Sequence, residues 1–233
     1  PFAYITNSAS SQVSVLDIAT NTVVASVPVP SNPQMVALNP EGTRAYVPSY
    51  DANNVSVIDT GTNAIIATVP VGARPFGVAI NPAGTRAYVT NNAAYTVSVI
   101  DTTANAVVAT IPVQAYPLGV AINPAGTRAY VVNGLFVNGV GDSISVIDTA
   151  SNSVIATIPT GAGTRGIAVN PAGTRIFVSS YIQSLNSYGL LVIDAATNSV
   201  LRKVRLSLVN PPSDVAINPA GTRVYVTNPN GVT

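Results

Sequence analysis

Short apolar runs separated by polar turn residues follow one another along the whole chain. In the stretch that begins at Pro75, β-branched and other apolar residues dominate four runs, at residues 76–81, 87–90, 97–101 and 107–113. Runs of this length between turn residues predict β-strands, and no segment has a sustained helical period. The pattern therefore predicts an all-β chain built from four-stranded units, whose strands we name A, B, C and D in chain order.

Two short phrases repeat in step with these strands. Asn-Pro-Ala/Glu-Gly-Thr-Arg begins at Asn39, Asn81, Asn123, Asn170 and Asn218, at spacings of 42, 42, 47 and 48 residues. Val-Ser-Val-Ile-Asp, with small changes, ends at Asp17, Asp59, Asp101, Asp148 and Asp194. Self-similarity at such a period is typical of repeat architectures, so copies of one unit make up the chain.

The residues between the strands predict hairpin turns. The A–B turn combines a proline, which fixes φ, with a glycine, which accepts a positive φ, and the C–D turn begins with an aspartate that can hydrogen-bond its own backbone. Four hairpin-linked strands form a propeller blade, whereas a β-solenoid would repeat in fewer residues. We predict a β-propeller of four-stranded antiparallel blades in one domain, 1–233. Its blade repeats lie near 1–33, 34–75, 76–117, 118–164 and 165–212, with closing or surplus strands in 213–233.

Strand A has small residues at alternate positions, which fits an innermost strand. In three repeats the pairs are Gly77 and Ala79, Gly119 and Ala121, and Gly166 and Ala168, and in two the first residue is larger, at Met35 before Ala37 and Asp214 before Ala216. Inner strands of neighbouring blades converge at the axis of a propeller, where bulky side chains would clash.

Three segments of one unit resemble the YVTN repeat. They are Ala87-Tyr88-Val89-Thr90-Asn91, Val97-Ser98-Val99-Ile100-Asp101 and residues 108–113, and residues 2–7 and 224–228 are similar. The chain therefore resembles the YVTN-repeat β-propeller family over essentially its whole length. That family includes surface-layer proteins, periplasmic propellers and relatives of lactonases and cofactor-dependent dehydrogenases, so the resemblance is specific for fold and broad for function.

The number of blades in the ring stays open on sequence. The chain reads as B-C-D, four complete units and A-B, which is 21 strands. In a closed five-bladed ring, residues 214–218 would complete the first blade beside residues 2–6, and residues 224–228 would be surplus. The seven-bladed ring typical of the family would need seven more strands. A surplus strand can also pair with the open edge of another subunit, which makes a homo-oligomer or polymer through blade edges an expected form.

Composition excludes several function classes. Charged residues make up only 8% of the chain and the net charge is +1, which gives no electrostatic footprint for nucleic acid or anionic lipid. Cys and His are both absent, so thiolate catalysis, disulfides and the commonest general base and metal ligand are excluded. No phosphate loop, nucleophile elbow or zinc motif occurs, and no apolar run is long enough to span a membrane. We therefore expect no enzyme, no cofactor, no metal site and no membrane span.

The loop rim is the expected place for binding. In a propeller of this kind the A–B and C–D turns lie on one rim, the turn rim, and the B–C and D–A loops lie on the other, the loop rim. The longer repeats insert residues in the loop rim, at 133–143, 180–189 and 206–212. Aromatic residues and arginines gather there, beside Asp51 and Asp142. The candidate binding residues are Tyr50, Arg74, Tyr95, Tyr116, Phe136, Arg165, Tyr181 and Tyr188.

Two readings of these rings remain open. Tyrosine offers a large contact area with a polar tip, which suits a glycan, a peptide or a partner protein. Alternatively, the rings pack the loops against the blades.

The repeated charges predict structure rather than ligand binding. The five repeat aspartates are expected to cap the C–D turns, and the five repeat arginines to bridge to them or to the next blade. The only basic cluster, Arg202-Lys203-Val204-Arg205, falls in an outermost strand, where positive side chains discourage aggregation between edges.

These observations lead to one expected function and two alternatives. We expect a noncatalytic, extracellular or cell-surface propeller that acts as a structural scaffold and as a protein or glycan interaction module. The chain has one Lys, is rich in Thr and Asn, and begins at Pro1, which favours export, with the periplasm as the alternative location. The alternative functions are a carbohydrate or peptide receptor that uses the aromatic loop rim, and a lactonase-like hydrolase with its site outside this segment.

Overall fold

The computed structural model describes residues 1–134, 142–161, 163–206, 210–228 and 231–232. These residues form 22 strands and one short 3₁₀ helix, arranged in four four-stranded and two three-stranded antiparallel sheets. The predictions of an all-β chain and of a four-stranded unit are confirmed. The chain divides into two compact units, Pro1–Thr110 and Ile111–Thr233.

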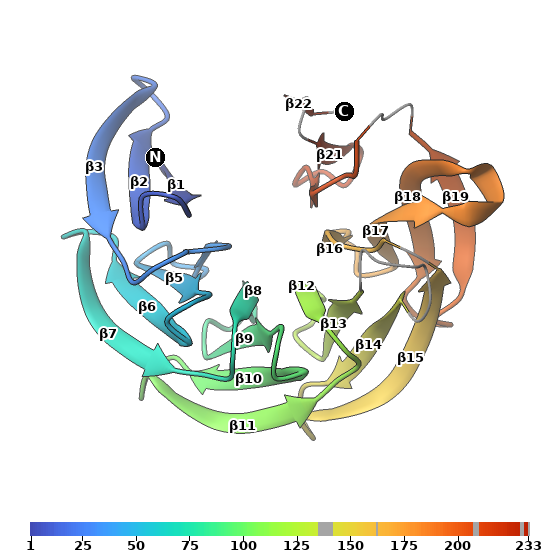
Figure 1. Cartoon of the computed structure of the whole chain (residues 1–233), viewed down its shortest axis with the longest axis horizontal. Helices are drawn as coiled ribbons and strands as arrows, with labels where there is room; N and C mark the ends of the chain where they lie inside the picture. Colours follow the sequence, from blue (N-terminus) through green and yellow to red (C-terminus); the bar gives the residue numbers. More distant parts are fainter. Residues whose placement is uncertain (135–141, 162, 207–209, 229–230, 233) are drawn as a thin grey trace. The chain divides into compact units, whose positions relative to one another are not determined.

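Unit 1 holds three sheets whose strands are neighbours in chain order (Figure 1). The first contains β1 (Phe2–Asn7), β2 (Gln12–Asp17) and β3 (Thr22–Pro28). The second contains β4 (Ala37–Leu38), β5 (Arg44–Ser49), β6 (Asn54–Asp59) and β7 (Ala64–Pro70). The third contains β8 (Pro75–Ile80), β9 (Arg86–Asn91), β10 (Thr96–Asp101) and β11 (Ala106–Pro112), which crosses the unit boundary.

Unit 2 repeats this plan. Its first sheet contains β12 (Pro117–Ile122), β13 (Arg128–Asn133), β14 (Asp142–Asp148) and β15 (Ser153–Gly161). The second contains β16 (Ile167–Val169), β17 (Arg175–Ile182), β18 (Ser187–Asp194) and β19 (Val200–Arg205), with the 3₁₀ helix η1 (Gln183–Leu185) between β17 and β18. The third contains β20 (Asp214–Ile217), β21 (Val224–Asn228) and β22 (Gly231–Val232).

The strands are therefore distributed over six sheets, where the sequence suggested about five blades. Strand β20 pairs with β21 in a sheet of its own, and β1 belongs to the sheet of β2 and β3. Among the described residues, no helix is long and apolar enough to cross a membrane.

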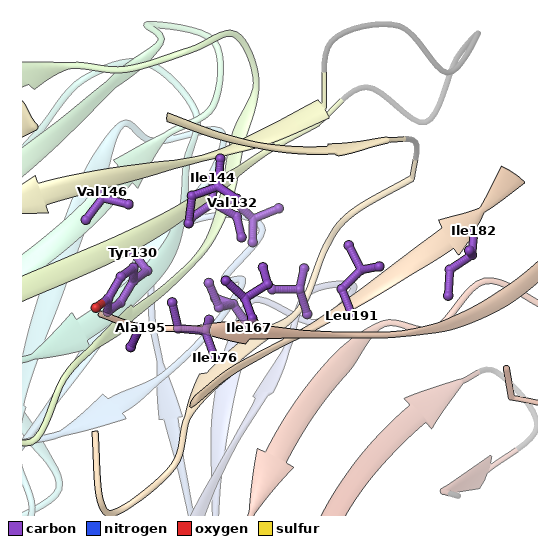
Figure 2. Packing of buried hydrophobic residues seen from close by; sticks show 12 residues of the cluster. Tyr130, Val132, Ile144, Val146, Ile167, Ile176, Ile182, Leu191 and Ala195 are labelled. Atoms are coloured by element: carbon purple, nitrogen blue, oxygen red, sulfur yellow. The ribbon is translucent and has the colours of Figure 1, made fainter. Parts of the chain in front are cut away.

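The middle strands are buried on both faces, as the continuous apolar runs predicted. Strands β5, β9 and β13 bury every residue that follows their first arginine. The signature tyrosines Tyr46, Tyr88 and Tyr130 are at most 2% exposed. Figure 2 shows the cluster of unit 2, to which Tyr130 and Ile144 of one sheet and Ile176 and Leu191 of the next sheet belong. Sheets that neighbour one another within a unit therefore seal the faces they turn toward each other.

Short-range hydrogen bonds fix the A–B and C–D turns of each repeat. In the first A–B turn, the Asn39 carbonyl accepts the Gly42 N–H at 2.8 Å, and the Asn39 side-chain oxygen accepts the Arg44 N–H at 2.8 Å. Gly42 has a φ of +69°, a left-handed conformation that glycine adopts without steric cost. In the following C–D turn, Asp59 Oδ1 accepts the Thr62 N–H and hydroxyl, both at 2.8 Å. The prediction that aspartates cap these turns is confirmed.

The threonine and asparagine of the signature tie strand B to its neighbours. Thr90 Oγ1 accepts the N–H of Gly77 at 2.8 Å, across a shift in register between β8 and β9. Asn91 Nδ2 donates to Ser98 Oγ on β10 at 2.9 Å, and Asn133 makes the same bond to Ser145 on β14. The signature thus carries its own cross-strand hydrogen bonds.

The small residues of strand A are required by close approach within unit 2. A Cβ atom on Gly119 would lie 2.7 Å from the carbonyl oxygen of Arg165, next to β16. A Cβ on Gly166 would lie 2.5 Å from the Cα of Asp214 on β20. Carbon atoms at optimal contact are about 3.5–4.0 Å apart, so neither position accepts a side chain without backbone movement. The predicted convergence of inner strands is confirmed here.

The sequence suggested that the repeat arginines bond either the turn aspartates or the next blade, and both kinds of bond occur. Arg86 pairs with Asp101 of its own sheet at 2.6 Å, and Arg175 pairs with Asp194 at 2.7 Å. Arg44 donates instead to the Thr102 carbonyl of the next sheet at 2.7 Å. Arg128 donates likewise to the Ala195 carbonyl of the next sheet at 2.9 Å.

Each outermost strand of four sheets contains a β-bulge that turns one apolar residue outward. The register with strand C shifts by one residue at Val24, Ile66, Ile155 and Leu201. These four side chains are 47–52% exposed. Arg202, Lys203 and Arg205 lie on β19, the outermost strand where the sequence placed them. Bulges of this kind interrupt the row of free backbone groups that another strand would need for pairing.

One predicted loop is largely strand. Strand β17 extends to Ile182 and β18 begins at Ser187, so most of residues 180–189 continue the B–C hairpin. At the other insertion, Asp142 and Ser143 already belong to β14. The prediction of loops there is wrong for these residues, because added residues can lengthen a hairpin as well as its loop.

Candidate binding surfaces on the loop rim

In unit 1 the loop rim presents a cation stacked on an aromatic ring. The guanidinium carbon of Arg74 lies 5.5 Å from the centre of the Tyr50 ring. Arg74 is exposed, and no carboxylate of the described residues lies within salt-bridge distance of it. A guanidinium over a ring is attracted by the electrons of its face, which favours one orientation of the side chain. The remaining N–H groups of Arg74 are therefore available to a ligand.

The backbone around Arg74 is held by two neighbouring loops. Its N–H donates to Asn53 Oδ1 at 2.8 Å, and its carbonyl accepts the Asn92 N–H at 2.8 Å. One residue earlier, the Ala73 carbonyl accepts the Ala93 N–H at 3.2 Å. The D–A connection therefore joins the B–C loop of the second sheet to that of the third.

Three of the candidate residues have a left-handed backbone. The φ angles are 55° at Arg74, 57° at Tyr95 and 56° at Tyr116. The equivalent positions of other repeats hold residues that accept this conformation more easily, namely Asn32 (φ 60°), Asn53 (54°) and Gly163 (63°). A bulky residue pays about 1–2 kcal/mol for it. Sequence reasoning missed this feature, although an alignment of the repeats shows bulky residues where Asn or Gly stands elsewhere.

Two other candidates, Tyr181 and Tyr188, face each other on the hairpin of β17 and β18. Their ring centres are 5.4 Å apart and the planes meet at 68°, an edge-to-face arrangement. The Tyr181 hydroxyl donates to Asn186 Oδ1 at 2.5 Å. These contacts occupy both rings in stabilising the extended hairpin, which is the packing role that the sequence left as an alternative.

A buried carboxylate fixes the loop rim of unit 2. Asp142 is 4% exposed, and its Oδ2 accepts the N–H of Thr164 at 2.9 Å and the Thr164 hydroxyl at 3.3 Å. The Tyr116 carbonyl accepts the Gly134 N–H at 3.2 Å. Asp142 thus anchors the D–A connection rather than presenting a charge to a ligand.

Arg165 follows Thr164 and lies near Asp214. Asp214 is exposed as a residue, but the protein atoms around its carboxyl displace water and raise its pKa, while the Val215 N–H and Arg165 oppose this effect. Arg165 is half-buried.

The structure thus brings together Tyr50 with Arg74 and Tyr181 with Tyr188. Tyr95 is 39% exposed. Phe136 lies outside the described residues. In the described part of the chain, no group of three Asp or Glu side chains is placed to hold a metal ion. The four turn aspartates with lowered pKa values all receive hydrogen bonds from the hydroxyl or N–H groups of their own turns.

Comparison with known proteins identifies the fold. No family model matches the chain, and no curated protein matches its sequence. Among solved structures, the Kuenenia stuttgartiensis hydrazine synthase is similar with a TM-score of 0.88 and 26% identity, over 97% of this chain and 70% of that one. A functionally unknown protein from Desulfotomaculum acetoxidans DSM 771 gives a TM-score of 0.79 and 19% identity, over 97% and 72% of the two chains. The chain is a β-propeller, and its membership of the YVTN-repeat family stays a prediction.

Proposed function

We propose that this protein is a noncatalytic propeller of the cell surface or extracellular space that binds acidic glycans through the loop rim of unit 1. The proposal rests on Arg74, which is exposed, stacks on the Tyr50 ring and has no carboxylate of the described residues within salt-bridge distance. Guanidinium groups bind carboxylates through two parallel hydrogen bonds, and tyrosine rings offer the flat amphipathic surface that sugar rings contact. A uronic acid presents both features.

The left-handed backbone at Arg74 and Tyr95 supports this role. Strain of this kind persists where the surrounding structure fixes it, and it concentrates at ligand-binding positions. The Arg74 N–H donates to the Asn53 side chain and the Arg74 carbonyl accepts the Asn92 N–H, and these two hydrogen bonds hold the strained backbone in place. The backbone at Arg74 therefore loses little further freedom when a ligand binds.

The absence of Cys and His from the sequence supports a noncatalytic role. A lactonase-like hydrolase is the alternative from the family resemblance, and turnover of any member of a lactone panel would contradict the proposal. The export of the chain rests on its composition and is tested by locating the native protein in cell fractions.

Binding of an oligouronate, measured by isothermal titration calorimetry, tests the proposed site. The variant Arg74→Asn keeps the backbone conformation, because Asn32 has the same φ region at the equivalent position. Removal of a charge-assisted hydrogen bond costs about 1.5–3 kcal/mol, so we expect roughly 10- to 100-fold weaker binding. The control is Arg202→Asn, which removes an exposed arginine from β19.

Equal affinity of the wild type and Arg74→Asn for the oligouronate would refute the proposed site. Binding of an acidic peptide but not of the oligouronate would refute the glycan as ligand while keeping Arg74 as the anchor.

A further inference from the structure

A pocket of about 400 Å³ lies on the turn rim of unit 2, between the sheets β12–β15 and β16–β19. The buried Tyr130 lines it, and Arg128 and Arg175 supply two guanidinium groups. Ala195 and Ala196 lie at the C–D turn that borders it. Figure 2 shows the Tyr130 ring near Ala195 at one end of the apolar cluster. The pocket is separate from the loop rim and from the function proposed above.

The Asp194 carboxylate and the Ala195 carbonyl, two hydrogen-bond acceptors at this pocket, already have donors within the protein. Asp194 receives the N–H groups of Ala196 and Thr197 on Oδ1 and pairs with Arg175 through Oδ2. The Ala195 carbonyl accepts Arg128 at 2.9 Å.

The hydroxyl groups that line the pocket retain their protons for other partners. Thr127 Oγ1 accepts the Asn123 amide at 3.0 Å, and Thr174 Oγ1 accepts the Asn170 amide at 3.1 Å. Two guanidinium groups and one carboxylate, Asp194, line the pocket, and Asp148 lies near Arg128 outside the lining, so the lining is rich in donors.

The pocket coincides with a departure from the repeat. In three other repeats, the threonine after the turn aspartate donates its hydroxyl to the carbonyl of the A–B turn glycine. Thr60, Thr102 and Thr149 each make this bond, at 2.6 Å. Of the five C–D turns, the first has Ile18 at this position and the fifth has Ala195.

The backbone at Ala195 keeps the repeat geometry although its side chain is shorter. Its N–H donates to the Thr174 carbonyl at 3.1 Å, as the Thr102 N–H donates to Thr85 at 3.2 Å. Gly173 has a φ of 70°, against 69° for Gly84. The two alanines therefore leave space and a donor-rich wall where the unit 1 equivalents are Thr102 and Thr103.

We propose that this pocket binds a small oxyanion, the carboxylate or phosphate group of a small molecule, with Arg128 and Arg175 as the donors. Guanidinium groups bind both anions through paired N–H donors, which fits the lining described.

The test compares thermal midpoints of the intact chain with inorganic phosphate, with citrate and with sodium chloride at matched ionic strength. At about a hundredfold excess over Kd, the bound anion should raise the midpoint by roughly 5 °C or more. The phosphate and citrate arms distinguish the two classes of anion, and calorimetric titration gives the Kd of each.

The variant Ala195→Thr/Ala196→Thr closes the pocket by restoring residues that the fold accepts elsewhere. We expect it to keep or raise the midpoint in the absence of anion and to lose the anion-dependent rise. Arg128→Gln, which leaves the pocket open, should weaken binding of the effective anion at least tenfold. The proposal is overturned if chloride gives the same rise, if neither anion binds, or if both variants bind as the wild type does. Arg74→Asn should leave these results unchanged, so this proposal and the proposed function fail separately.

Discussion

Replacing Gly166 by alanine should destabilise the fold because strand A has no room for a side chain there. The added Cβ would lie 2.5 Å from Asp214 Cα and 2.8 Å from both the Asp214 carbonyl carbon and the Val215 nitrogen. All three are backbone atoms, so β16 and β20 must separate by about 1 Å to reach an ordinary contact distance. Overpacking of this kind costs about 1–3 kcal/mol, and loss of glycine freedom in the unfolded chain returns about 0.4–1 kcal/mol. Because all three atoms are backbone atoms, the upper end of the overpacking range applies, and we expect a net loss of about 2 kcal/mol.

Urea-induced unfolding measures this loss through the midpoint and slope of the transition, followed by far-ultraviolet circular dichroism. Two glycine controls separate steric clash from backbone conformation. At Gly61 the nearest atom to an added Cβ is Asp59 Oδ1 at 3.5 Å, so Gly61→Ala should be neutral or slightly stabilising. At Gly42 nothing lies within 4 Å but φ is 69°, so Gly42→Ala should cost only about 1 kcal/mol. The reasoning is refuted if Gly166→Ala is as stable as Gly61→Ala.

Three further predictions concern single interactions. Gly72→Ala should lower the free energy of unfolding in urea by about 1–3 kcal/mol, because its Cβ would lie 2.7 Å from the side-chain amide of Asn91. That amide is buried and bonded to Ser98, so it has little room to move. Stability equal to that of Gly61→Ala would contradict this prediction. Thr102→Ala should cost about 1 kcal/mol in the same assay, since the Gly84 carbonyl loses its 2.6 Å partner, and an unchanged midpoint would show that the bond contributes nothing. The thermal midpoint should fall below about pH 4, because turn hydrogen bonds hold the pKa of four aspartates below its ordinary value, so that their stabilisation is lost as pH falls through the folded pKa. Asp214, whose pKa is raised, acts in the opposite direction as one group against four. A midpoint that rises on acidification below pH 4 would contradict the prediction.

The turns and the inner strands could be predicted from sequence because their causes are local or repeated. Asn39, Gly42 and Asp59 each act within a few residues, and the same letters return in every unit. The small residues at Gly119 and Gly166 mark close approach through the pattern alone.

The site could be predicted only in part, because side-chain partners depend on contacts between sheets. The sequence singled out Tyr50 and Arg74 but gave no sign that they stack. It treated Asp142 as a rim charge, whereas the fold buries it against Thr164. The pocket beside Ala195 lies where the equivalent turn carries Thr102, and this difference gains meaning only once the Thr102 hydroxyl is seen to bond the Gly84 carbonyl.

The bulged outer strands determine how copies of this protein meet at high concentration. An approaching strand finds the ladder broken at Val24, Ile66, Ile155 or Leu201, so first contact is made by aliphatic side chains and not by peptide groups. Aliphatic contacts strengthen on warming and in sulfate, and they weaken on cooling. Salting out should therefore yield a precipitate of folded molecules that dissolves again in cold dilute buffer, without the fibrillar growth that a continuous open edge would permit.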